Sequence, residues 1–277
     1  MDEFDIIARY FAPLAGEGAF GLADDAAVLP LWAGHDLVVT TDALAEGTDF
    51  FPADPPDTVA QKALRANLSD LAAKGASPAY YLLNLTLPHN VTPAWLKEFA
   101  AGLKRDQEMF GISLLGGDTN AGSLSIAVTA FGFVREGRMV KRSGARVGDH
   151  VYVTGTIGDS GGGLAILHGE GAGLSTADRD SLISRYRVPE PPVNFGATGL
   201  ADVAHAGIDI SDGLIADLGH VAKASRVAIV VDGARVPLSP ALKALWGRGG
   251  LVRAVTAGDD YQIAFTGPPG LSGHFTA

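Results

Sequence analysis

The sequence contains no cysteine among its 277 residues. Disulfides, thiolate nucleophiles and cysteine-ligated zinc are therefore excluded. Basic residues are also few, since 21 Lys and Arg stand against 31 Asp and Glu, which gives a formal net charge of −10. A surface that neutralises nucleic-acid phosphates needs clustered Lys and Arg. We therefore expect no nucleic-acid partner.

Long apolar runs are missing as well. No stretch approaches the ~18 consecutive apolar residues that would span a bilayer. The first residues, MDEFDIIARYF, are acidic and lack the basic-then-apolar order of a secretory signal. We expect no membrane partner and a cytoplasmic location. A hydrophobic content of 47% with 19% charged residues is typical of a compact folded chain.

Glycine is abundant, with 36 residues, and several aspartates stand in short contexts of Gly, Ser or Thr. Carboxylates beside small residues at the ends of apolar segments suit a hard cation with oxygen ligands, above all Mg²⁺, which commonly carries phosphates. The repetition of this pattern along the chain predicts a multi-metal phosphate site. The motifs are GLADDAAV, VTTDALAEG, NLSDLAAKG, LGGDTNAG, DISDGL and AGDDYQI.

Hydrophobic periodicity predicts a mixture of helices and strands without regular βαβ alternation, which favours an α+β fold over a doubly wound parallel sheet. The polar, glycine-bearing segment 135–149 separates residues 1–140 from residues 141–277 as two domains. The predicted helices are 2–12, 57–75, 93–110, 160–169, 177–187, 194–206 and 213–225, and the predicted strands are 26–31, 36–41, 80–87, 112–115, 124–134, 150–154, 227–232 and 260–266.

Two glycine-rich segments have more than one interpretation. Gly16–Gly21 matches GxGxxG but follows a helix rather than a strand, so a loop that closes over phosphates is favoured over a dinucleotide site. The run Thr154–Gly163 follows a strand and lacks the Lys of a P-loop. It is either a tight strand-to-helix turn or a helix N-terminus that meets an anion.

Single aspartates have structural alternatives to metal binding. Asp70 lies in an apolar helix and shares a face with Asn67, so it is exposed, paired or a metal ligand. Asp212 precedes Gly213 and a helix, which makes it a plausible helix cap. The alternation of Asp209 and Ser211 places both on one side of an extended segment.

Taken in order, these segments resemble the thiamine-monophosphate kinases, a family in the larger group that includes aminoimidazole ribonucleotide synthetase. The resemblance spans essentially the whole chain. Cysteine-dependent members of the larger group fit less well, because this chain has no cysteine. The matching strings are Leu22–Val28, Thr40–Leu44, Asn67–Ala73, Gly116–Thr119, Arg142–Ala145, Val153–Ser160, Asp209–Leu214 and Gly258–Tyr261.

The resemblance implies ATP-dependent phosphorylation of thiamine monophosphate to thiamine diphosphate, with several Mg²⁺ ions and direct in-line transfer. It implies a homodimer in which residues 1–140 bind ATP and metal and form a dimeric β-barrel, followed by an α+β domain at residues 141–277. The implied metal ligands are Asp25, Thr40, Thr41, Asp42, Asp70, Asp118, Asp209 and Asp212, of which Asp42, Asp70, Asp118 and Asp212 form the predicted catalytic set. The implied nucleotide contacts are Gly117, Asp118, Arg142 and Ser211, and the implied substrate contacts are Asp49 and Asp259.

The sequence departs from the family pattern in two places. Asp49 stands where the family usually has a histidine that contacts the substrate. The chain ends at Ala277, where the family continues with an aromatic residue near the thiamine, so we expect a shortened second domain that binds Mg-ATP better than thiamine monophosphate. Two other functions remain open: an ATP-dependent synthetase of the same larger group, or a catalytically impaired ATP-binding relative.

Overall fold

The computed structural model describes residues 3–271 and 275–276 and divides the chain into two compact units. Unit 1 comprises Met1–Leu71 and Ala76–Gly137, and unit 2 comprises Ala72–Gly75 and Arg138–Ala277. Each unit has its own four-stranded sheet. Within the described ranges, no helix is long and apolar enough to cross a membrane.

The sheet of unit 1 has the strand order β1-β4-β2-β3. Its strands β1 and β4 pair antiparallel, as do β4 and β2, whereas β2 and β3 pair parallel. This mixed pairing confirms an α+β arrangement and excludes the doubly wound parallel alternative. The strand bounds are β1 His35–Ala45, β2 Ser77–Leu87, β3 Ser113–Ala121 and β4 Ser125–Arg135.

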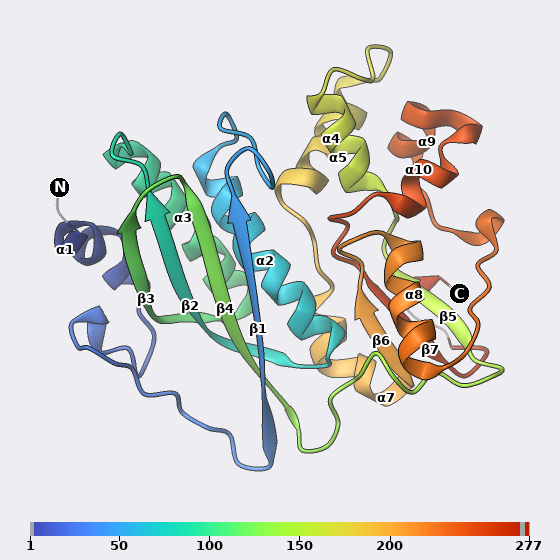
Figure 1. The fold of residues 1–277 in the computed structure, drawn as a ribbon, viewed down its shortest axis with the longest axis horizontal. Coiled ribbons are helices and arrows are strands. Elements are labelled where there is room, and N and C mark those ends of the chain that lie inside the picture. Colours follow the sequence, from blue (N-terminus) through green and yellow to red (C-terminus); the bar gives the residue numbers. More distant parts are fainter. Residues whose placement is uncertain (1–2, 272–274, 277) are drawn as a thin grey trace. The chain divides into compact units, whose positions relative to one another are not determined.

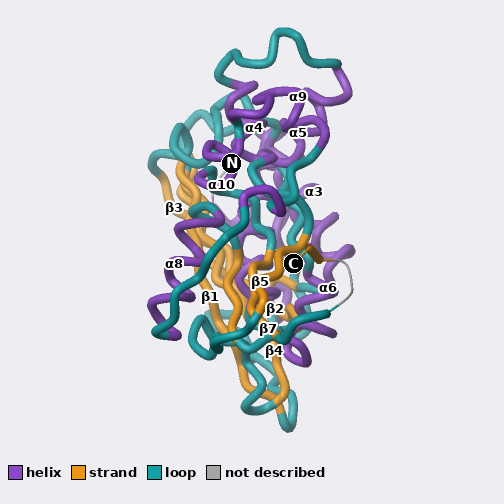
Figure 2. Tube along the Cα trace, turned by 90° about the vertical axis from the view of Figure 1, so that its right-hand side faces the viewer, coloured by secondary structure: helices purple, strands orange, loops and turns teal. Residues whose placement is uncertain are grey.

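Helices α2 (Pro56–Ala73) and α3 (Pro93–Phe110) cover one face of this sheet (Figure 1). In the view turned by 90°, α3 lies to one side of the strands (Figure 2). The Thr92 side chain caps α3 by accepting the Trp95 N–H at 3.1 Å, and Gly111 ends it in the left-handed conformation. Every second residue of β2 from Ala79 to Leu87 is buried, which gives the sheet one apolar face.

A buried ion pair fixes α2 against α3. Arg65 donates to both carboxylate oxygens of Asp106 at 2.8 Å, and Gln61 donates to the same carboxylate at 2.8 Å. Both charged side chains are almost fully buried, so loss of either partner would leave an unpaired buried charge. The pair therefore holds the helix that carries Asp70 in a fixed position.

The sheet of unit 2 is antiparallel, with the order β6-β7-β5-β8. Helix α8 (Leu214–Ser225) follows β6 and packs Leu214, Leu218 and Val221 onto the apolar side chains of the sheet. Figure 1 shows α8 beside β6 and β7. The strand bounds are β5 His150–Thr154, β6 Ala206–Asp209, β7 Ile263–Gly267 and β8 Phe275–Thr276.

The remaining elements are short helices and turns. They are α1 Glu3–Ile6, η1 Ile7–Phe11, η2 Ala12–Leu14, η3 Phe20–Leu22, α4 Asp159–Leu167, α5 Thr176–Arg187, α6 Val193–Phe195, η4 Gly196–Leu200, α7 Ala201–Val203, η5 Gly233–Arg235, α9 Pro240–Trp246, η6 Gly247–Gly249 and α10 Leu251–Thr256.

Two predicted strands are wrong. Segments 26–31 and 227–232 are apolar and rich in valine or leucine, but neither pairs with a strand in the described part of the chain. Their side chains are correspondingly open to solvent, as Leu31 (72% exposed) and Val230 (90% exposed) show. A β-rich composition favours a strand only where a partner strand is available.

Other differences concern boundaries. The predicted helix 2–12 is a short α-helix that continues as a π-helical turn, and residue 2 lies outside the described residues. The predicted helix 194–206 is divided into α6, η4 and α7, and β6 then begins at Ala206. Strand β6 and helices α9 and α10 were not predicted, because each is too short to show a clear hydrophobic period.

Candidate functional site

Strand β1 and helix α2 bring three oxygen-bearing side chains together, and we call Thr40, Asp42 and Asp70 the unit-1 oxygen cluster. Alternation along β1 places Thr40 and Asp42 on the same face. The Thr40 hydroxyl donates to Oδ2 of Asp70 at 2.5 Å. The pKa of Asp42 is raised to about 6, first by burial of the carboxyl and then by the charge and hydrogen bonding of Asp70. The Asp42 residue as a whole is exposed, so the burial that shifts its pKa is only partial.

Thr41 lies on the opposite face of β1. Its hydroxyl donates to the Val128 carbonyl at 3.0 Å and is 3.1 Å from the Thr129 hydroxyl, both on the paired strand β4. The side chain is therefore held away from Thr40 and Asp42. Its assignment as a metal ligand stays a prediction.

A cavity of about 340 Å³ in unit 1 collects a second group of predicted residues. Asp25, Gly117 and Asp118 line it, together with Asp24 and apolar side chains of β2, β3 and the N-terminal segment. Asn120 donates to Oδ2 of Asp118 at 2.5 Å. The residues that line this cavity do not include the unit-1 oxygen cluster, so Asp25 and Asp118 form one group, the oxygen cluster forms another, and Thr41 belongs to neither.

Gly117 has a conformation that only glycine can adopt here. Its φ is +155°, and a Cβ atom would lie 1.7 Å from the Leu83 carbonyl oxygen on β2. The glycine therefore lets β3 run beside β2, where Gly117 pairs with Leu83 and Asp118 pairs with Asn84. The predicted strand ended at residue 115, but β3 continues to Ala121, so Asp118 lies within the strand.

The GxGxxG segment packs beside this cavity. The Gly16 N–H donates to the Leu114 carbonyl on β3 at 2.8 Å, and Ala19 and Leu22 line the cavity wall. The segment ends in a short 3₁₀ turn, Phe20–Leu22, rather than opening the helix of a dinucleotide-binding fold. The segment is thus a loop at the pocket.

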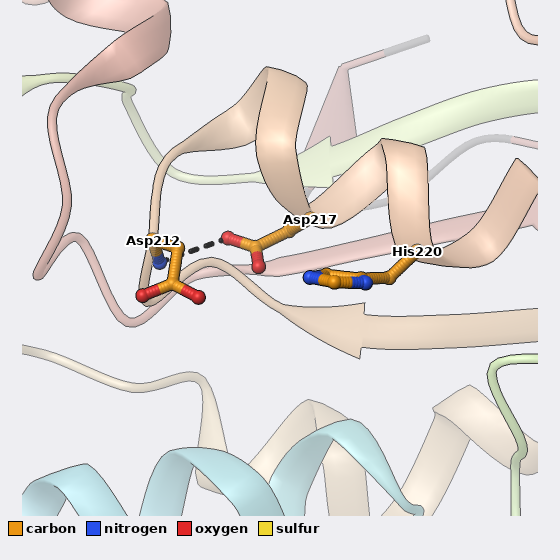
Figure 3. A group of neighbouring side chains, drawn as sticks. All are labelled: Asp212, Asp217 and His220. Atoms are coloured by element: carbon orange, nitrogen blue, oxygen red, sulfur yellow. Dashed lines mark hydrogen bonds between the residues drawn. The ribbon is translucent and has the colours of Figure 1, made fainter. Parts of the chain in front are cut away.

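In unit 2, Ser211 and Asp212 lie in the loop between β6 and α8. Figure 3 shows Asp212 in this loop. Asp212 is exposed, and the N-cap of α8 is Gly213, so Asp212 is not the N-cap residue of that helix. Asp217 on the first turns of α8 reaches back instead, and its Oδ2 accepts the N–H groups of Ser211 and Asp212, each at 3.1 Å. Burial raises the pKa of Asp217; the backbone N–H of Asp212 lowers it, and the Asp212 charge raises it.

His220 joins these two aspartates. One ligand atom from each of Asp212, Asp217 and His220 lies within 4.8 Å of the others. Sequence reasoning did not single out Asp217 or His220, although their three-residue spacing on a helix places both on one face. Asp209, the other predicted ligand of unit 2, is buried at the end of β6.

The Gly258–Tyr261 loop is tied to the loop that bears Ser211. The Asp259 N–H donates to the Ser211 carbonyl at 2.9 Å, and the Tyr261 N–H donates to the Ile210 carbonyl at 2.8 Å. Asp259 has a φ of +65°, in the left-handed region, and its carboxylate accepts from the Tyr261 hydroxyl at 3.3 Å. The structure therefore places the predicted substrate residue Asp259 beside the predicted nucleotide residue Ser211.

Backbone N–H groups of the glycine-rich run 154–163 donate hydrogen bonds to a carboxylate from elsewhere in the same chain. Asp260 accepts the Gly158 N–H at 2.6 Å and the Ser160 N–H at 3.3 Å, at the N-terminus of α4. Burial raises the pKa of Asp260 to about 7, although these N–H groups lower it. The run therefore forms the tight strand-to-helix turn that was one of its two predicted interpretations. The anion at the N-terminus of α4 is the side chain of Asp260.

Arg142 and Asp49 each have contacts within their own unit. Arg142 is exposed, and its carbonyl accepts from the Ser225 hydroxyl at 3.2 Å. Asp49 is partly buried, and its Oδ2 accepts the Ala45 N–H at 2.8 Å in the turn after β1. Their roles toward nucleotide and substrate stay predictions.

Comparison with known proteins gives a consistent result. Residues 23–134 match the family described as AIR synthase related protein, N-terminal domain. The thiamine-monophosphate kinase of Escherichia coli K12 is 43% identical over 270 residues, which cover 96% of this chain and 82% of that protein.

Solved structures agree with this match. The thiamine-monophosphate kinase of Stenotrophomonas maltophilia K279a superposes with a TM-score of 0.84 at 41% identity, covering 90% of this chain and 79% of that one. The structure of AaThiL complexed with AMPPCP and TMP superposes with a TM-score of 0.80 at 34% identity, covering 91% of this chain and 85% of that one.

Proposed function

This chain belongs to the thiamine-monophosphate kinase family and is a kinase, and we propose that it transfers the γ-phosphoryl group of ATP to thiamine monophosphate. A relative whose structure holds AMPPCP and TMP supports both ligands. The structural observation that carries the proposal is the unit-1 oxygen cluster, because it places two carboxylates and a hydroxyl together without any nitrogen or sulfur ligand.

The residues present fit Mg²⁺. The unit-1 oxygen cluster offers only hard oxygen donors, and the Asp70 charge adds to burial in raising the pKa of Asp42, as expected for two neighbouring carboxylates. We propose that Mg²⁺ ions bind at Asp25, Thr40, Thr41, Asp42, Asp70 and Asp118 of unit 1, and at Asp209 and Asp212 of unit 2. When bound, Mg²⁺ neutralises the bridging and terminal phosphate oxygens of the nucleotide.

The residues of the chain bind and orient the reactants. Gly117 has no side chain to cover its backbone at the unit-1 cavity, and Ser211 has a hydroxyl in the loop before the N-terminus of α8. We therefore assign both residues, together with Arg142, to nucleotide binding. Arg142 is exposed and free to turn its guanidinium toward a phosphate. The nucleophile is a phosphate oxygen that is already anionic, so this reaction needs no general base. Direct in-line transfer is the simplest mechanism.

Asp259 and Asp49 are the proposed contacts to thiamine monophosphate. The support for Asp259 is its place beside Ser211, because a substrate bound there would lie next to the proposed nucleotide loop. A carboxylate at either position would attract the positive thiazolium ring. A homodimer formed through unit 1 completes the proposal.

Stereochemistry tests the mechanism. ATP made chiral at the γ-phosphorus by oxygen isotopes and sulfur should give thiamine diphosphate with inverted configuration, as a single in-line displacement requires. Retention would require two displacements and a phosphoenzyme, and would contradict direct transfer. ADP formation that does not depend on thiamine monophosphate would contradict the proposed activity itself.

A further inference from the structure

The buried carboxylate of Asp217 is the feature of unit 2 that the proposed reaction leaves unexplained. We propose that Asp217 is a positioning residue that fixes Ser211 and Asp212 in the orientation needed for nucleotide and metal. This inference rests on the proposed function for the roles of Ser211 and Asp212. The inference goes beyond the proposed function because it names the residue that holds Ser211 and Asp212 in place.

The hydrogen bonds carry the argument. Asp217 is 2% exposed, and one of its oxygens accepts two successive backbone N–H groups, those of Ser211 and Asp212, each at 3.1 Å. Two N–H groups that converge on one oxygen fix the orientation of two neighbouring peptide planes. The directions of the Ser211 and Asp212 side chains are therefore set by a residue further along the chain.

This arrangement leaves the Asp212 carboxylate accessible. An aspartate before a helix commonly turns its side chain back to cap the first N–H groups. Here the N-cap is Gly213, and Asp217 satisfies the N–H of Asp212. Figure 3 shows the hydrogen bond from the Asp212 backbone to Asp217, while the Asp212 carboxylate extends from the loop.

His220 provides an internal control. It lies within 4.8 Å of the same carboxylates, three residues after Asp217, and it is exposed. In the described structure it takes no part in the two hydrogen bonds that hold the loop. A positioning role belongs to Asp217 alone, whereas a cluster that ligates a metal directly would use His220 as well.

Amide hydrogen exchange tests the restraint without any ligand. In Asp217→Ala, the amides of Ser211 and Asp212 should exchange about fivefold faster than in the wild type, because each loses a hydrogen bond of about 1 kcal/mol. Amides in the middle of α8 should keep their rates. If the alanine variant does not fold, Asp217→Leu, which fills a similar space but has no acceptor, carries the same test. Unchanged exchange at both amides overturns the inference.

Calorimetric titration with AMPPCP and Mg²⁺ tests the consequence. We expect Asp217→Ala, or Asp217→Leu if the alanine variant does not fold, to lose about fivefold or more in affinity, as the loss of about 1 kcal/mol predicts, and His220→Asn to stay within about twofold. Equal affinity in the wild type and the Asp217 variant overturns the positioning role, as does an equal loss in His220→Asn. If the wild type itself does not bind, the proposed function fails instead, and the exchange experiment still decides the restraint.

Discussion

Asp42 on β1 and Asp70 on α2 share one hydrogen-bonded site, and the pKa of Asp42 is raised to about 6 by burial first and by the neighbouring Asp70 second. A proton on Asp42 competes with any cation at this position. Below about pH 6 the proton is retained, and above it the carboxylate is free to bind metal. The unit-1 oxygen cluster should therefore bind Mg²⁺ more tightly as pH rises through about 6.

Asp70→Asn separates charge from shape. The amide keeps the size of the side chain and an acceptor for Thr40, but it loses the charge that Mg²⁺ requires. We expect activity to fall by about 100-fold or more, since changes around a metal ligand already cost 10–100-fold. The melting temperature should change little. Carbon-13 NMR of the Asp42 carboxyl should show its pKa returning toward the ordinary value, and near-normal turnover at low Mg²⁺ would remove Asp70 from the site.

Gly117 and Gly116 form a matched pair of positions on β3. An added Cβ at Gly117 would lie 1.7 Å from the Leu83 carbonyl oxygen, whereas at Gly116 it would meet only the Leu82 side chain at 3.6 Å. Gly117→Ala should destabilise unit 1 by about 2 kcal/mol or more through backbone displacement, and should weaken nucleotide binding. Gly116→Ala should be tolerated. Denaturant unfolding of both variants checks this, and similar stabilities would contradict the close approach of β3 to β2.

The stability of unit 2 should depend on Asp260. Its pKa is about 7 in the folded protein against 3.8 for the unperturbed group. Between these values the folded state holds a proton that the unfolded state has released, so stability falls as pH rises. The expected loss is about 2 kcal/mol between pH 5 and pH 7.

Asp260→Asn should remove this part of the pH dependence, because the amide oxygen still accepts the Gly158 N–H and carries no charge. The exposed Asp180 on α5 offers the matched control, and Asp180→Asn should keep the wild-type slope. Thermal unfolding from pH 5 to pH 7 measures both. An unchanged slope in Asp260→Asn would show that this carboxyl is ionised throughout.

The exposed edge of strand β1 leads us to expect a homodimer. It is an edge strand of eleven residues that pairs with β4 alone among the described strands, and Leu37 and Val39 on one face are exposed. Long apolar edges of this kind favour pairing with a second copy. Light scattering at micromolar concentration should give twice the 28.5 kDa chain mass.

A charge on β1 should disrupt that pairing. Val39→Asp is expected to give a monomer, while Val147→Asp, at a 96% exposed position of unit 2, should remain dimeric. A wild-type monomer would contradict the predicted association, and a dimeric Val39→Asp would place the interface elsewhere.

The sequence predicts elements well where periodicity and end signals agree. Helix α3 matches its predicted range, because Pro93 and Gly111 mark its ends and an apolar stripe runs between them. Segment 227–232 has the composition of a strand, but pairing depends on a distant partner that local sequence does not encode.

In the candidate site, too, some residues can be predicted from the sequence and others cannot. Asp70 was identified because a carboxylate is unusual in so apolar a helix, and the structure brings it to Thr40 and Asp42. Asp217 was missed, because its role depends on the direction of two backbone N–H groups in a loop, which no residue pattern reveals.

The central claim is that this chain moves the γ-phosphoryl group of ATP onto thiamine monophosphate. The most direct measurement is mass spectrometry of the products after incubation with Mg²⁺, thiamine monophosphate and ATP labelled with oxygen-18 in the γ-phosphate. The account predicts thiamine diphosphate that carries the label in its terminal phosphate, formed in step with ADP by the wild type and nearly absent with Asp70→Asn. ADP with labelled inorganic phosphate and no labelled thiamine diphosphate would contradict it.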